Sequence, residues 1–236
     1  ATQAHGSVVV KVENTMILAT VVASSESKPD QTFFPLSVDY QEKFASSGRI
    51  PGNFFRRESR LSEYEILISR LVDRAVRPLF PDSFLNETQI YIQLISGDQK
   101  NMPDCYAALA ASAALAISDI PFDGPISEVR VIKLDGKYIV NPERTSLAGA
   151  DLNLIVAATL KDVMMVEGEA NECQESELIE AIKVAHEAIK VQCHAQLALA
   201  QLVGEKALTK RDMVVPEIDT ELKDLISDIA KDKILS

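Results

Sequence analysis

The hydrophobic positions of the first forty residues fall in short runs rich in β-forming residues, separated by polar segments. Residues 7–13 and 16–23 are two β-rich runs two residues apart, and they predict a hairpin. Residues 32–40 are a third strand candidate, in which Pro35 indicates an edge position or a bulge because proline cannot donate a ladder hydrogen bond. The chain is therefore expected to open with three strands.

Helical periodicity begins at Ser62. Ser62 and Glu65 have the spacing of a capping box, in which the two side chains satisfy free N–H groups of the first turn. The apolar residues behind them fall on one helical face, and they are Ile68, Leu71, Val72 and Ala75. Pro78 is expected to end this helix.

The rest of the chain mixes strands, hairpins and helices. The predicted elements are a strand over 88–96, an alanine-rich helix from Pro103 to about Ser118, a hairpin over 126–134 and 137–141, a strand pair over 151–158 and 162–169, and a long helix from about Glu175 to Leu202. Asp135 and Gly136 support the hairpin because Asp-Gly favours a type I′ turn. Residues 205–216 have the composition of a linker, and 217–235 predict an acidic amphipathic helix.

This order favours one fold class. Three strands precede the first helix and two hairpins precede the last, so strands and helices do not alternate strictly. The pattern indicates an α+β fold and disfavours a doubly wound parallel sheet. Two domains are predicted, one over 1–204 and a helical segment over 205–236.

Charge is distributed unevenly. The chain has a formal net charge of -11, whereas residues 49–77 carry seven arginines against four acidic residues. Residues 161–236 carry sixteen acidic residues against nine basic ones. A local basic site on an acidic body suits a threaded single strand better than a broad duplex-binding face.

Cysteine content and hydropathy indicate in which cellular compartment the protein is expected. The chain has three cysteines and no CxxC pair, which predicts a protein without disulfides in a reducing cytoplasm. No apolar run has the length of a membrane span, and no signal peptide pattern is present at the start. The first residue is not methionine, which predicts a processed chain or a piece of a longer one.

The strongest candidate for chemistry is an aromatic and arginine-rich segment. Its members are Phe54, Phe55, Arg56, Arg57 and Arg60, and they follow a loop over 48–53. Aromatic faces stack on unpaired bases and arginines bind phosphates, so the segment predicts contact with a single-stranded nucleic acid. One of the two phenylalanines has an alternative role as a buried anchor of the loop.

Three further arginines lie on the predicted helix. Arg70, Arg74 and Arg77 share one stripe of its surface and are candidates for phosphate or RNA contacts. The alternative is a solvated face with internal ion pairs such as Asp73 with Arg77.

Other groups give no sign of a catalytic or metal site. His186 and His194 are two helical turns apart, which is not the spacing of a metal-binding pair. Glu167 and Glu169 share a strand face and are expected to face solvent rather than to bind a cation. No phosphate-binding glycine motif or nucleophile elbow occurs.

Several segments together resemble the bacterial polynucleotide phosphorylase family. They are FFPLSVDYQEK (33–43), GRIPGNFFRRESR (48–60), LVDRAVRPLFP (71–81) and IPFDGPI (120–126), and the FFRR element is the most specific. The resemblance covers nearly the whole chain. It implies the ribosomal protein S5 domain 2-like fold of RNase PH, with this chain as the first of two such domains plus the start of a helical linker domain.

The resemblance also implies a function. The family degrades RNA from its 3′ end, uses inorganic phosphate as co-substrate and releases nucleoside diphosphates. It forms a homotrimeric ring in the cytoplasm whose channel mouth is lined by the FFRR loop, a role that carries over to Phe54, Phe55, Arg56, Arg57 and Arg60. Proteins of the RNA-degradation machinery are expected partners, and DNA is not.

The same resemblance argues against catalysis by this copy. Active copies have a Gly-Thr-Arg phosphate-binding element, whereas the matching region here is 101–105 and lacks Thr-Arg. The positions that match the metal-binding Asp, Asp and Lys are Leu147, Asn153 and Ile155. The catalytic residues and the Mg²⁺ site are therefore expected in the second copy, beyond this chain. Two alternatives stay open, a self-sufficient exoribonuclease and a structural ring subunit without RNA contact.

Overall fold

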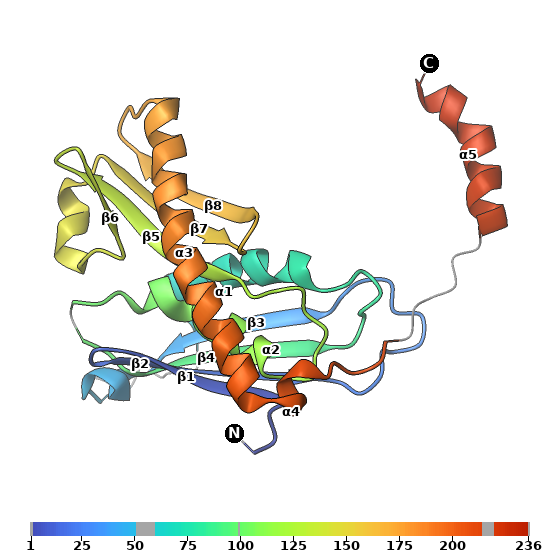
Figure 1. The fold of residues 1–236 in the computed structure, drawn as a ribbon, viewed down its shortest axis with the longest axis horizontal. Helices are drawn as coiled ribbons and strands as arrows, with labels where there is room; N and C mark the ends of the chain where they lie inside the picture. Colours follow the sequence, from blue (N-terminus) through green and yellow to red (C-terminus); the bar gives the residue numbers. More distant parts are fainter. Residues whose placement is uncertain (1, 51–59, 99, 214–219, 236) are drawn as a thin grey trace.

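Two four-stranded β-sheets and three long helices make up the body of the molecule (Figure 1). The structure is a computed structural model, and it describes residues 2–50, 60–98, 100–213 and 220–235. No helix among these residues combines the length and the apolar character that crossing a bilayer requires.

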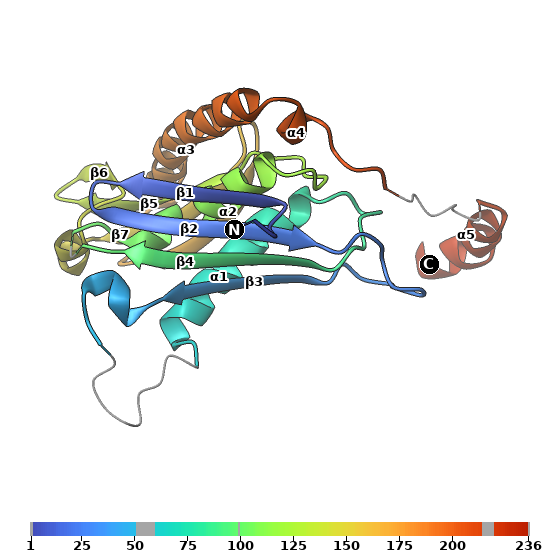
Figure 2. The ribbon, with the colours of Figure 1, turned by 90° about the horizontal axis from the view of Figure 1, so that it is seen from below.

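The first sheet has the strand order β1-β2-β4-β3 (Figure 2). Its strands are β1 (Gly6–Val12), β2 (Thr15–Ala23), β3 (Leu36–Glu42) and β4 (Thr88–Ser96). The β1–β2 hairpin and the strand β4 confirm the prediction. The predicted start of the third strand at residue 32 is wrong. β3 begins only at Leu36, after Pro35, which has no N–H to donate to a ladder.

The second sheet has the strand order β6-β5-β7-β8, and every neighbouring pair is antiparallel. Its strands are β5 (Ser127–Leu134), β6 (Lys137–Val140), β7 (Leu152–Ala158) and β8 (Val163–Ala170). Asp135 and Gly136 both have positive φ, 49° and 73°. These are the angles that a type I′ turn requires, so the predicted hairpin is confirmed.

The helices fill the space between the sheets and cover the second one. They are α1 (Glu63–Val76), α2 (Ala107–Ala116), α3 (Glu175–Val203), α4 (Glu205–Leu208) and α5 (Thr220–Leu235), with 3₁₀ helices η1 (Phe44–Ser47), η2 (Arg77–Leu79), η3 (Pro103–Tyr106) and η4 (Arg144–Gly149). α1 and α2 pack on the first sheet, and α3 packs on the second. The element order agrees with the predicted α+β class.

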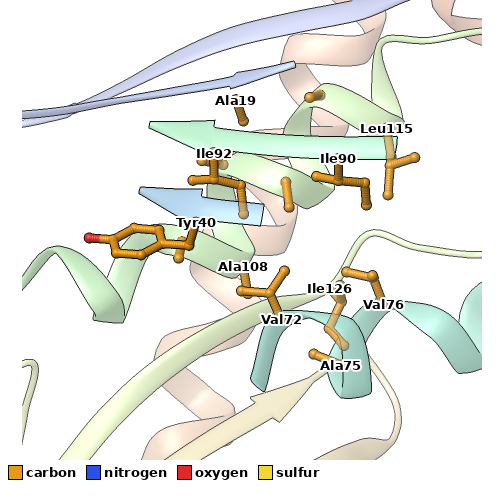
Figure 3. Close-up of a cluster of buried hydrophobic side chains, with 14 of the residues drawn as sticks. Ala19, Tyr40, Val72, Ala75, Val76, Ile90, Ile92, Ala108, Leu115 and Ile126 are labelled. Carbon is orange, nitrogen blue, oxygen red and sulfur yellow. The ribbon is translucent and has the colours of Figure 1, made fainter. Parts of the chain in front are cut away.

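The larger core lies between the first sheet and the helices α1 and α2. Figure 3 shows Ile90 and Ile92 of β4 facing Val72 and Val76 of α1. Every second residue of β2 and β4 points into this core, as the period of a strand requires. The second core lies between α3 and the far face of the second sheet. The second sheet is thus covered on both faces.

Small side chains let α2 approach the first sheet closely. Most residues of this alanine-rich helix are buried, which confirms the close packing that its composition predicts. On β1, a Cβ added at Gly6 would lie 2.0 Å from the carbonyl oxygen of Ala114. Only glycine fits at this crossing of strand and helix.

The segment after α4 folds back onto the body. Lys210 donates hydrogen bonds to carbonyl oxygens at the end of α2, the shortest of them 2.6 Å from the oxygen of Ser118. Arg211 binds both carboxylate oxygens of Asp119, at 3.1 and 2.7 Å, and the carbonyl of Ser24 at 3.1 Å. Positive side chains at a helix C-terminus satisfy free carbonyls and complement the helix dipole. These contacts hold the segment that contains Lys210 and Arg211 against the end of α2 and the end of β2.

We expect Arg211→Ala to lower the free energy of unfolding by about 1 to 2 kcal/mol, because it removes a charged, largely shielded set of hydrogen bonds. Urea unfolding followed by circular dichroism measures the loss. Lys206→Ala, at an exposed position of α4, serves as the matched control and is expected to leave stability unchanged. Equal stability of the two variants would show that the segment after α4 does not hold the body together.

Candidate nucleic-acid interface and a buried charge cluster

Most of the aromatic and arginine-rich segment lies outside the described residues. The gap between residues 50 and 60 contains Phe54, Phe55, Arg56 and Arg57. Arg60 is described, and its side chain is exposed. The structure therefore shows the stem of this loop, which leaves the end of β3 through η1 and re-enters at the start of α1.

One carboxylate joins the two sides of the stem. Glu65 accepts the N–H of Glu42, before the loop, at 2.7 Å and the N–H of Ser62, after the loop, at 2.6 Å. The Ser62 hydroxyl accepts the N–H of Glu65 at 3.2 Å, which confirms the predicted capping box. Glu65 is 8% exposed, so water competes weakly for these bonds. Glu65 therefore holds together the two ends of the stem, at Glu42 and Ser62.

Arg77 has a structural role. Its guanidinium forms a double hydrogen bond with Asp73, at 2.9 and 3.0 Å, and donates to the carbonyls of Phe34 and Leu36 at 3.1 Å. It also lies 5.8 Å from the centre of the Phe34 ring. The ion pair with Asp73, which was the alternative to a phosphate contact, is confirmed. With its donors engaged, Arg77 holds the start of β3 against the end of α1.

The other two arginines of the stripe differ from each other. Arg74 pairs with Glu167 of β8 at 2.5 Å and so links α1 to the second sheet. Glu167 is exposed, as predicted, and it is the ion-pair partner of Arg74. Arg70 is exposed and makes no ion pair with another residue in the described part of the chain. Of the three helical arginines, Arg70 is therefore the one without an ion pair among the described residues.

A buried charge cluster lies where η3 meets the second sheet. Arg130 of β5 donates to the Asp104 carboxylate at 2.5 Å and to the Asn153 amide oxygen at 2.8 Å. Asp104 also accepts the N–H of Cys105 at 3.0 Å. The side chains of Arg130 and Asp104 are only 13% and 3% exposed. A charged pair so well shielded from water depends on its two members being present together.

Glu128 lies two residues before Arg130 on the same face of β5. It is fully buried, and neither carboxylate oxygen has a hydrogen-bond partner within the described structure. The pKa of Glu128 is raised to about 8, mainly by burial and also by the charge of Asp104, while Arg130 partly offsets the rise. Glu128 is therefore expected to be protonated at neutral pH.

The pKa of Glu128 predicts a pH-dependent stability. The folded pKa lies above the unfolded one, so its contribution is complete below about pH 4.5 and is lost as the pH rises through about 8. We expect stability to fall by roughly 1 kcal/mol per pH unit in this window. Glu128→Gln is expected to abolish that slope, as measured by urea unfolding between pH 6 and 8, whereas exposed Glu26→Gln is expected to keep it. A Glu128→Gln variant with the wild-type slope would contradict the assignment.

The positions matched to the catalytic site of the family do not fit a metal ion. Leu147 and Ile155 pack with their hydrocarbon side chains against the larger core. Asn153 is engaged by Arg130, and Asp104 stands in the region of the missing Thr-Arg element. Magnesium requires several oxygen ligands, and the described residues contain no group of three His, Cys, Asp or Glu side chains that would hold a metal.

Histidines and cysteines have local structural roles. His186 bonds to the Thr159 carbonyl at 3.0 Å, and His5 accepts the Ala23 N–H at 3.2 Å. Cys105 and Cys193 are buried free thiols, and burial raises the pKa of both. A raised thiol pKa makes a cysteine a poor nucleophile.

Comparisons with known proteins agree with the fold and the motifs. The family described as "3' exoribonuclease family, domain 1" matches residues 1–121, and "3' exoribonuclease family, domain 2" matches residues 124–188. A polyribonucleotide nucleotidyltransferase of Parabacteroides distasonis is 56% identical over 228 residues, which are 97% of this chain and 30% of that protein. One from Cytophaga hutchinsonii is 56% identical over 229 residues, 97% of this chain and 32% of that protein. The chain spans about a third of the length of these relatives.

Solved structures share the architecture at low identity. One is described as an Archaeoglobus fulgidus exosome with RNA bound to the active site, and it matches with a TM-score of 0.65 and 19% identity over 81% of this chain and 83% of that one. An archaeal exosome core matches with a TM-score of 0.64 and 19% identity over 84% of this chain and 83% of that one. These neighbours support the RNase PH-like fold that the sequence predicts.

Proposed function

Because the chain belongs to the 3′ exoribonuclease family of RNase PH domains, we propose that it is part of a polyribonucleotide nucleotidyltransferase. The observation that carries this proposal is the identity of 52–56% to eight proteins with that name over nearly all of this chain. The whole enzyme is then a phosphorolytic 3′-to-5′ exoribonuclease that takes part in mRNA decay.

The reaction determines what the whole enzyme must bind. Inorganic phosphate attacks the phosphorus at the last internucleotide bond of RNA, that bond breaks, and the terminal nucleotide leaves as a nucleoside diphosphate. A divalent cation such as Mg²⁺ would neutralise charge at the reacting phosphate. The described side chains at the matched positions, Leu147, Asn153 and Ile155, do not fit such an ion, so its site is proposed in a second RNase PH-like domain.

This copy is proposed to be non-catalytic. Its support is the buried charge cluster, in which Arg130 engages both Asp104 and Asn153 at the matched positions. An incoming phosphate would meet the buried carboxylate of Asp104 instead of a free arginine. The repulsion of two negative charges in a poorly solvated site disfavours phosphate binding there.

The remaining task of this copy is to guide single-stranded RNA. The proposed contacts are Phe54, Phe55, Arg56, Arg57 and Arg60, on a loop whose stem is fixed by Glu65. Arg70 is added as an exposed cation on the helix that follows the loop. Arg74 and Arg77 are left out because their guanidinium groups are already paired within the fold.

Assembly and location follow from the same proposal. The whole enzyme is proposed to form a homotrimeric ring in the cytoplasm, with this domain contributing to the ring wall. Proteins of the RNA-degradation machinery are proposed partners, whereas DNA and membranes are not.

The proposal is tested by incubating the purified chain with a single-stranded RNA, inorganic phosphate and Mg²⁺ and measuring release of nucleoside diphosphates. The full-length Parabacteroides distasonis relative serves as the positive control. RNA binding by the chain is measured at low and high salt in parallel. We expect no diphosphate and a binding affinity that falls with salt, because phosphate contacts release counterions.

The other outcomes separate the alternatives. Release of nucleoside diphosphates by this chain alone would make it a self-sufficient exoribonuclease and would overturn its non-catalytic role. Absence of RNA binding at low salt would favour a structural ring subunit without RNA contact.

A further inference from the structure

Three segments that are far apart in the sequence meet near the stem of the arginine-rich loop. The Gly97 N–H, just after β4, bonds to the carbonyl of Ser46 in η1 at 3.0 Å. The Arg144 N–H, at the start of η4, bonds to the carbonyl of Lys100 at 3.2 Å. Figures 1 and 2 both show η1 and η4 at the same end of the molecule. The fold therefore brings residues of η4 to the end of the first sheet from which the loop leaves.

Tyr64 places an aromatic ring at this stem. It lies in the first turn of α1, two residues after Ser62, and it is 37% exposed. Burial raises the pKa of the Tyr64 hydroxyl, so the side chain is neutral at physiological pH. A neutral and partly exposed aromatic ring is a surface on which an unpaired base can stack.

Arg144 supplies a positive charge at the same place. Burial raises the pKa of both Glu42 and Tyr64, whereas the charge of Arg144 lowers both, which places its guanidinium near these two side chains. Arg144 is exposed, and it forms no ion pair with the residues that the structure describes. The Glu42 carboxylate instead accepts a hydrogen bond from the Tyr40 hydroxyl at 2.7 Å. The Arg144 guanidinium is thus available to an anion.

We propose that Tyr64 and Arg144 form a second RNA contact at the stem, in which a base stacks on Tyr64 and a neighbouring phosphate binds Arg144. An aromatic ring and a guanidinium close together match the two parts of one nucleotide, its base and its phosphate. Neither residue belongs to the aromatic and arginine-rich segment, and only the fold brings η4 near α1. The inference rests on the proposed RNA-binding function and names a further contact for it.

A fluorescent reporter tests the stacking in the full 236-residue chain. The sequence contains no tryptophan, so Tyr64→Trp introduces a single reporter and keeps an aromatic ring at this position. We expect single-stranded RNA to quench its fluorescence, and an abasic oligonucleotide of equal length, which has phosphates but no bases, to leave it unchanged. Phe33→Trp is the matched control, because Phe33 is 66% exposed and precedes β3, at the opposite end of that strand from the stem. RNA is expected not to quench this control.

Fluorescence anisotropy with a labelled oligoribonucleotide separates the roles of the two residues. Tyr64→Ala is expected to weaken binding roughly tenfold without changing the slope of log affinity against log salt, since stacking involves no ion pair, and Tyr64→Phe is expected to bind like the wild type. Arg144→Gln is expected to make that slope less steep by about 0.7, the contribution of one phosphate on a single strand. Lys161→Gln, at an exposed position beyond the end of β7 that is remote from η4, is expected to keep the wild-type slope.

The outcomes distinguish this contact from the proposed function as a whole. The inference is overturned if RNA does not quench Tyr64→Trp, or if Arg144→Gln keeps the wild-type slope. If those results come with RNA binding that is weakened by replacing Arg56 and Arg57, the proposed function stands and only the second contact is wrong. Absence of RNA binding by the wild-type chain overturns both. Circular dichroism checks that Tyr64→Ala is folded, and if it is not, Tyr64→Trp and Arg144→Gln decide.

Discussion

Replacement of Asp104 by alanine is expected to lower the free energy of unfolding by about 3 to 5 kcal/mol. The loss is large because the variant leaves Arg130 charged and only 13% exposed, with its carboxylate partner gone. The cost comes mainly from this unpaired guanidinium and less from the attraction that is lost. Equilibrium unfolding in urea, followed by circular dichroism at pH 7, measures it.

Asp151→Ala is the matched control, because Asp151 carries the same charge at an exposed position before β7. It is expected to change stability by no more than about 0.5 kcal/mol. A loss below about 1 kcal/mol in Asp104→Ala would mean that Arg130 finds another partner or reaches water, which contradicts a closed cluster.

Local signals were sufficient to predict most elements from the sequence. The β1–β2 hairpin, the capped helix α1 and the type I′ turn at Asp135 each depend on residues close together in the chain. The composition of α2 also predicted its close packing, since the small side chain of alanine lets a buried helix approach a sheet closely. Such features are encoded by neighbours and do not require knowledge of the tertiary fold.

Strand pairing and ion pairing could not be predicted from such local signals. The parallel pairing of β3 with β4 joins strands separated by the whole of α1. The partner of Arg74 is 93 residues away, so sequence placed three similar arginines on one stripe and could not tell which were engaged. Glu65 was predicted as part of a helix cap. Its second hydrogen bond, from the N–H of Glu42 across the loop, could not be predicted from any sequence motif.

The buried charge cluster was missed for a related reason. Along β5, Glu128 and Arg130 alternate with Val129 and Val131. Such alternation normally indicates a strand with one face in solvent. The second sheet is covered on both faces, so its polar face is buried against η3 and α2, and the charges must neutralise one another. The burial of this polar face becomes evident only from the packing of η3 and α2 against the second sheet.

The paired substitution Arg56→Ala with Arg57→Ala is expected to lower the affinity for single-stranded RNA at least about tenfold, because each arginine of the loop is proposed to hold a phosphate. The logarithm of affinity against that of salt concentration is expected to become less steep by about 1.4, the contribution of two phosphate contacts on a single strand. Fluorescence anisotropy with a labelled oligoribonucleotide at several salt concentrations gives both quantities.

Lys183→Ala with Lys190→Ala removes the same charge from α3, where Lys183 is exposed and Lys190 is partly exposed, and is the matched control. If net charge alone controls binding, both pairs weaken it equally. If the loop binds RNA, only the arginine pair changes the salt slope. Urea unfolding of both pairs checks that each variant is folded. An unchanged affinity and slope in the arginine pair would favour the alternative of a structural subunit without RNA contact.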